Sequence, residues 1–123
     1  MRLLKLAALA AALSAASAAS AHHSSAMFDL ANETVMSGSV KQLQITNPHS
    51  WLMVVVPGVA GAEDTWSLEM GPVSSITRMG VSRATFKPGD AVVVTVNVLR
   101  DGRRAGRLVR VTRPTGELLY GQR

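Results

Sequence analysis

Three observations predict a mainly β fold, a small five-stranded barrel with one short helix. Five runs of apolar and β-branched residues are separated by turns rich in Gly, Pro, Asn and Asp. Apolar residues recur at helical spacing in only one short segment, residues 72–80. The chain has 123 residues and 47% of them are hydrophobic, which suits one domain with a modest core.

The first 21 residues have the pattern of a cleaved export signal. Arg2 and Lys5 precede an apolar stretch at residues 6–16, and Ala19-Ser20-Ala21 supplies the small residues that a signal peptidase needs. We therefore expect cleavage after Ala21 and a periplasmic location. The alternative is an uncleaved membrane anchor, which the weakly hydrophobic Ala/Ser-rich run disfavours. Cleavage would leave 11 basic and 8 acidic residues.

The absence of cysteine limits the chemistry of this chain. With no cysteine, disulfides, thiol nucleophiles, cysteine zinc sites and a lipid-bearing N-terminal cysteine are all excluded. No nucleophile elbow, phosphate loop or paired-carboxylate pattern is present. The sequence therefore gives no positive argument for an enzyme.

The mature chain divides into an N-terminal arm at residues 22–33 and a β-barrel domain at residues 34–123. The first strand is expected at residues 34–46, where Gly38 indicates a bulge or bend and alternating Leu43 and Ile45 mark a buried face. The run WLMVVV at residues 51–56 predicts a central second strand.

The remaining elements complete the order β-β-β-α-β-β. Residues 65–70 alternate with a period of two, and Pro72 then opens a short helix that Gly80 ends. Two strands are expected at residues 91–99 and 107–113, with a short edge at residues 117–120. This order is that of an OB-like barrel, which carries a helix between its third and fourth strands. An open sandwich is the alternative.

A cluster of arginines in the last hairpin raises the local positive charge. Strict alternation would place Arg107 and Arg113 on the face of Val109 and Val111, with Arg110 on the other face. Such a hairpin is either a solvated surface or a site for an acidic partner, anionic lipid or nucleic acid. Nucleic acid is a disfavoured partner, because an exported chain would not meet it in its usual location. Only 4% of residues are aromatic, which is too few for platforms on which bases stack.

The three histidines are the candidate metal ligands. After cleavage, His22 would bind Cu(II) through its α-amine and imidazole, and His23 or His49 would add a third nitrogen. His49 lies in the turn Asn47-Pro48-His49-Ser50-Trp51, whose Asn47 and Trp51 are further candidate binding residues. Glu69 is an outside candidate if its strand lies beside His49. The alternative is that His22 and His23 only flank the cleavage site, while His49 caps a turn.

Two other metal interpretations are weaker. Zinc is less favoured than copper, because no acidic or cysteine ligand has convincing spacing. Methionine could bind Cu(I), but these residues are scattered singly, and we expect them to fill the core. They are Met27, Met36, Met53, Met70 and Met79.

Several short motifs occur together in a fixed order along the mature chain. They are His22-His23-Ser24, Ala26-Met27-Phe28-Asp29, Gly38-Ser39-Val40, Asn47-Pro48-His49, Trp66-Ser67-Leu68-Glu69, Lys87-Pro88-Gly89-Asp90, Arg100-Asp101-Gly102 and Gly106-Arg107-Leu108. In this combination the chain resembles the small exported bacterial proteins grouped as domain of unknown function 6152. Such proteins typically carry an aromatic residue two positions before Asn-Pro-His, where this chain has Ile45. The resemblance implies an exported single domain and draws attention to the histidines, and it supplies no mechanism.

Two function hypotheses from different classes follow. The first is a non-enzymatic periplasmic binding module that captures and delivers a copper ion held by His22, His23 and His49. The second is a metal-free accessory protein whose barrel face or basic hairpin docks an exported protein partner. A third interpretation, an oxidative copper enzyme with a terminal histidine, suits so small a domain poorly.

Overall fold

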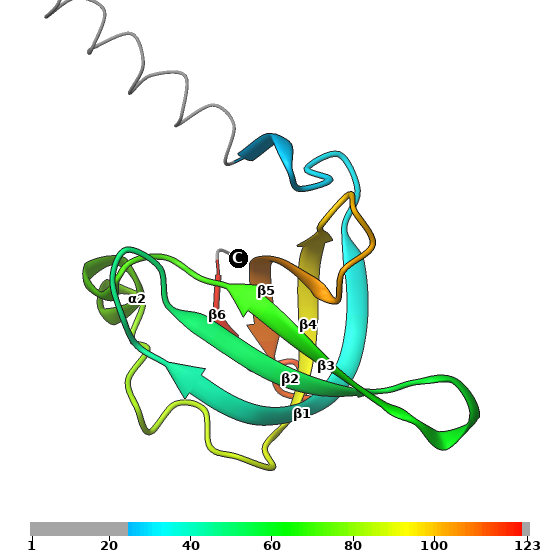
Figure 1. Cartoon of the computed structure of the whole chain (residues 1–123). Coiled ribbons are helices and arrows are strands. Elements are labelled where there is room, and N and C mark those ends of the chain that lie inside the picture. The colour runs from blue at the N-terminus through cyan, green and yellow to red at the C-terminus, as the bar shows by residue number, and fades with distance from the viewer. Residues whose placement is uncertain (1–24, 122–123) are drawn as a thin grey trace, which may run out of the picture.

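The computed structural model describes residues 25–121, which form a β-barrel with one short α-helix (Figure 1). The sheet order is β3-β2-β1-β4-β5-β6, and a pairing between β3 and β5 closes the first five strands into a barrel. The predicted mainly β, five-stranded fold is confirmed. The elements are β1 (Thr34–Gln44), β2 (Trp51–Pro57), the 3-10 turn η1 (Val59–Gly61), β3 (Glu63–Glu69), α2 (Val73–Arg78), β4 (Ala91–Val98), β5 (Ala105–Thr112) and β6 (Leu118–Tyr120).

Strand β1 pairs with a different neighbouring strand in each of its two halves. Its first half, from Thr34 to Ser39, pairs with β4, and its second half, from Ser39 to Gln44, pairs with β2. The bulge lies at Lys41 rather than at Gly38. Gly38 is needed for a different reason: a Cβ there would collide with the backbone of Val55. The strand therefore bends where the two neighbouring strands crowd it.

The core is built from alternate residues of the strands. Leu52 and Val54 of β2 and Leu68 of β3 are fully buried, while their neighbours along each strand are more exposed. The predicted alternation in the third strand is thus confirmed. Helix α2 adds Ile76, which is also fully buried and packs on the same cluster.

Strand β5 departs from strict alternation, and the predicted orientation of Arg110 is wrong. The register with β4 shifts between Thr95 and Val96, so Val109 is an extra, bulged residue. A bulge adds one residue to one strand and therefore inverts the alternation beyond it. Leu108 and Val111 are consequently both buried, and Arg107 and Arg110 are both exposed.

The last two strands differ slightly from their predicted bounds. Strand β5 begins at Ala105, two residues earlier than predicted, because Ala105 and Gly106 pair in parallel with β3 at the barrel seam. Strand β6 pairs with β5 and confirms the predicted short edge. In the part of the chain that the structure describes, no helix is long and apolar enough to cross a membrane.

Candidate functional site

The turn that carries His49 is braced on both sides. The side chain of Asn47 accepts a hydrogen bond from the backbone N–H of Val73, at the start of α2, at 3.0 Å. Ser50 is fully buried, and its hydroxyl accepts from the N–H of Thr46 and donates to the Thr46 carbonyl, both at 3.2 Å. The turn therefore has little freedom, and His49 projects from a rigid corner of the barrel.

His49 and Glu69 lie side by side at the ends of neighbouring strands. Trp51, which begins β2, pairs with Glu69, which ends β3. The Nδ1 atom of His49 lies 3.1 Å from the Glu69 carboxylate, and the two side chains are 50% and 22% exposed. Glu69 was a candidate only if its strand lay beside His49, and the structure places it there.

A groove with a volume of about 810 Å³ opens next to this pair. Five parts of the chain line it: the N-terminal arm, the corner of His49 and Glu69, helix α2 with Met79 at its C-terminal end, strand β4 through Asn97, and the C-terminal hairpin. The groove is thus the place where the arm, the corner and the helix meet.

The arm reaches this groove because it is fixed to the barrel. The N–H of Asp29 donates to the Val98 carbonyl at 2.8 Å, and the N–H of Arg100 donates to the Met27 carbonyl at 2.9 Å. Phe28 is 7% exposed and forms a β-bridge with Leu99. These contacts attach the arm to the end of β4 and to the turn that follows it.

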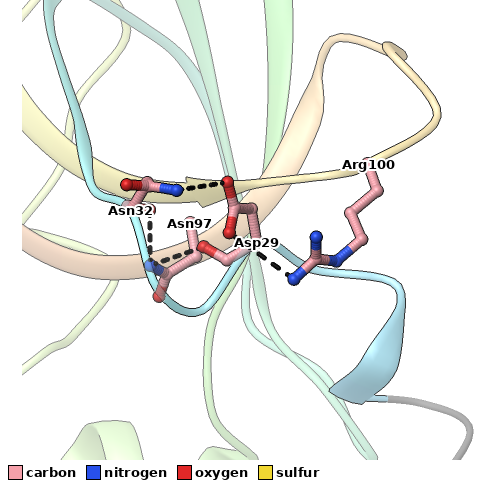
Figure 2. Close-up of polar contacts among 4 residues, drawn as sticks. All are labelled: Asp29, Asn32, Asn97 and Arg100. Atoms are coloured by element: carbon pink, nitrogen blue, oxygen red, sulfur yellow. Dashed lines mark hydrogen bonds and ion pairs between the residues drawn. The ribbon is translucent and has the colours of Figure 1, made fainter.

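Asn97 anchors the arm, and sequence reasoning did not single it out. Its buried side-chain amide donates to the carbonyls of Asp29 at 3.2 Å and Asn32 at 3.0 Å, as Figure 2 shows. The sequence does contain one sign of this role, because Asn97 is the single amide in the apolar run AVVVTVNV. A buried amide needs hydrogen-bond partners from outside its own strand.

A carboxylate strengthens the same attachment. Asp29 accepts a hydrogen bond from the Asn32 side chain at 2.9 Å and lies 3.5 Å from the Arg100 guanidinium (Figure 2). The Asn32 amide has the largest effect and lowers the pKa of Asp29, and burial comes next and opposes it. Arg100 and nearby backbone N–H groups add to the lowering, so the pKa lies below its ordinary value. The carboxylate is therefore the form that favours the fold of the arm, and through Arg100 it also favours the contact of the arm with the barrel.

The structure brings together only part of the predicted site. His22 and His23 lie outside the described residues. Asn47 is engaged with α2, and neither Asn47 nor Trp51 lines the groove. Within residues 25–121, no three His, Asp or Glu side chains gather closely enough to hold a metal ion. Of the predicted site residues, the structure thus brings together only His49 and Glu69.

The methionines follow the predicted core role only in part. Met70 is 3% exposed and belongs to the core, as expected. Met27 and Met79 are each 45% exposed, so core filling does not account for them. Met79 lines the groove.

Comparison with known proteins gives one match. The model of a family described as "Family of unknown function (DUF6152)" matches residues 10–109, which is most of the chain. No curated protein and no solved structure matches the chain.

Proposed function

Because this chain belongs to the DUF6152 family of unknown function, its role rests on the geometry of its own site, and we propose that it is an exported, non-enzymatic copper-binding module. Cu(II) is held by the amine and imidazole of His22, by His23 and by His49. The protein captures the ion and delivers it in the periplasm, after its signal peptide is cleaved behind Ala21.

The contact between His49 and Glu69 is the observation that carries the proposal. Histidines that bind metals usually direct their second ring nitrogen at a carboxylate, which fixes the ring and its tautomer. Here Nδ1 of His49 lies 3.1 Å from Glu69. In a neutral imidazole, a proton on Nδ1 leaves the lone pair on Nε2, where a metal would bind. Glu69 thus acts as the orienting group rather than as a ligand.

The position of Ser25 supports a copper site that combines the N-terminal histidines with His49. Ser25 lines the same groove as His49. His22 precedes Ser25 by three positions, and three residues span at most about 10 Å. The amine of His22 therefore lies within about 10 Å of Ser25, which lines the groove. Imidazole and amine nitrogens together form the nitrogen-rich set that Cu(II) prefers.

Copper titration of the mature chain tests this proposal. A chain that begins at His22 should bind one Cu(II) against a weak chelator, and His49→Ala should weaken binding by about tenfold or more, which is about 1.4 kcal/mol. Glu69→Gln should weaken it by about 10- to 100-fold through loss of the orienting carboxylate. Glu63→Gln is the matched control, because Glu63 is an exposed acid at the other end of β3.

A second control isolates the terminal amine. A chain that retains Ala21 keeps all three histidines but moves the amine away from His22, so its affinity for copper should fall sharply. The intact mass of protein purified from the periplasm establishes where cleavage occurs. Unchanged copper affinity in His49→Ala would remove His49 from the site.

The alternative is a metal-free accessory protein, and one feature favours it. The hairpin of β2 and β3 extends beyond the barrel (Figure 1), and Val59 at its tip is 89% exposed. An apolar side chain presented in this way suits contact with an exported protein partner. A stoichiometric partner that survives chelation and is lost in Val59→Asp would support this alternative over copper binding.

A further inference from the structure

Most arginines of the last hairpin are neutralised by acids of the same chain. Arg100 pairs with Asp29, Arg103 with Asp101, Arg104 with Asp64, and Arg113 with Glu117, at distances between 2.7 and 3.5 Å. Across residues 25–121, Arg107 and Arg110 have no such partner. Both of them line the groove.

The bulge at Val109 brings these two arginines to the same side of β5. Without the bulge, residues 107 and 110 would face opposite sides of the strand. With it, Leu108 and Val111 point into the core, and Arg107 and Arg110 both point outward. The bulge thus creates a pair of guanidinium groups at the groove, a common use of bulges next to binding sites.

Glu69, the acid that faces Arg107 on the neighbouring strand, does not form an ion pair with it. Glu69 is its partner in the parallel register of β3 and β5. The Glu69 carboxylate nevertheless contacts His49, at 3.1 Å. Arg107 is therefore left with its donors available, although an acid lies on the neighbouring strand.

The groove also has apolar walls that are open to solvent. Leu30 and Met79 are 48% and 45% exposed, and both line it. They are two of the five large apolar side chains that are markedly exposed between residues 25 and 121. Beneath them, buried Leu108 and Tyr120 also line the groove. A ligand that combines an anionic group with an apolar body would match both kinds of surface.

We propose that this groove binds a small amphipathic organic carboxylate, with its carboxylate on Arg107 and Arg110 and its apolar part against Leu30 and Met79. Guanidinium groups bind carboxylates through paired, charge-assisted hydrogen bonds. A volume of about 810 Å³ is within the range of small-molecule sites. Because Glu33 and Glu69 also line the groove, a monoanion fits better than a doubly charged phosphate.

Binding of dodecanoate to the mature, metal-free protein in the presence of EDTA tests this proposal by calorimetry. Dodecanoate should bind at one equivalent, and dodecan-1-ol, acetate and inorganic phosphate should each bind at least about tenfold more weakly. Arg107→Ala/Arg110→Ala should weaken dodecanoate binding by about tenfold or more, and Leu30→Ser should weaken it severalfold.

The matched control is Arg103→Ala/Arg104→Ala. It removes the same charge from the same hairpin, but these arginines are paired with Asp101 and Asp64, and neither lines the groove. Its affinity for dodecanoate should change by less than about twofold. Equal losses in the two double variants, tighter binding of phosphate, equal binding of the alcohol, or no binding of dodecanoate would each overturn the proposal.

This proposal stands apart from copper binding. Arg107→Ala/Arg110→Ala keeps all three histidines, and His49→Ala keeps both arginines. Failure of dodecanoate to bind would thus leave the copper titration unaffected, and failure of copper to bind would leave the carboxylate result unaffected.

Discussion

Asn97 donates its side-chain amide to the main-chain oxygen of Asn32 at 3.0 Å, across 65 positions of sequence. A second bond from the same amide reaches Asp29. One buried side chain thus ties the N-terminal arm to strand β4, and the arm in turn supplies one wall of the groove.

Replacing Asn97 with Ala should therefore destabilise both the arm and the fold. Two carbonyl oxygens lose their donor, so the free energy of unfolding should fall by about 1–3 kcal/mol. Asn97→Asp should cost more, because its carboxylate would face two carbonyl oxygens. Urea denaturation measures the change, and Gln42→Ala is the control, since it removes an amide that is exposed on β1. Equal stability of Asn97→Ala and Gln42→Ala would contradict this role.

Docking of the arm should depend on pH below about 4. Hydrogen bonding and Arg100 lower the pKa of Asp29 in the folded protein below the ordinary value of 3.8. Its stabilising contribution is thus fully present above that value and is lost as the pH falls through the lower, folded-state pKa. The difference in stability between the wild type and Asp29→Asn should shrink across this acidic range.

Asp101 titrates over a similar range and must be controlled. The backbone N–H of Arg103 first, and its side chain second, lower the pKa of Asp101. Denaturation of Asp29→Asn, Asp101→Asn and the double variant at each pH separates the two contributions. At neutral pH, cleavage of the arm by a protease should increase with Asp29→Asn and stay unchanged with Asp101→Asn.

Gly106 should tolerate no side chain, because it lies at the seam where β5 meets β3 and β4. A Cβ at this position would collide with the Asn97 carbonyl and the Val96 side chain. Gly106→Ala should lower the free energy of unfolding by about 1–3 kcal/mol through overpacking. Gly102→Asn is the control, because no atom lies within 4 Å of a Cβ there and Asn tolerates its positive φ. A neutral Gly106→Ala would show that the seam can widen.

Ile76 should be the main attachment of helix α2 to the barrel. It is fully buried and is the one buried residue of this six-residue helix. Ile76→Ala should cost about 2–5 kcal/mol, and Val59→Ala, at a side chain that is 89% exposed, should change stability by less than about 0.5 kcal/mol. Thermal denaturation of the two variants checks the difference. A small cost at Ile76 would mean that the helix is held mainly through Asn47.

The fold was predictable because the central strands β2 and β3 keep a strict period of two. Leu52 with Val54, and Leu68 with Met70, face the core in the order that their alternation requires. Turn residues marked the ends of the strands, and Pro72 marked the start of the helix. Local sequence carries this information, because burial of one face and turn geometry are local constraints.

The parts of the site that depend on bulges and distant contacts were not predictable. A bulge such as that at Val109 leaves no clear mark in a β-branched run, so the orientation of Arg110 was assigned wrongly. The partners of Asn97 lie 65 and 68 positions away. The sequence could not predict that Glu69 lies next to His49. Which strands are neighbours depends on the topology of the sheet and not on spacing along the chain.

The division of β1 between two neighbours determines the order in which the molecule can assemble. A fragment that ends before Ala91 retains β2 and β3 but lacks every strand partner of residues 34–38. The arm, too, attaches to residues close to position 100. The first part of the described chain thus acquires its stable contacts only after the last third has arrived, and such distant pairings make folding slow. Until β4 has joined, residues 34–38 present an unpaired strand edge that another chain could pair with.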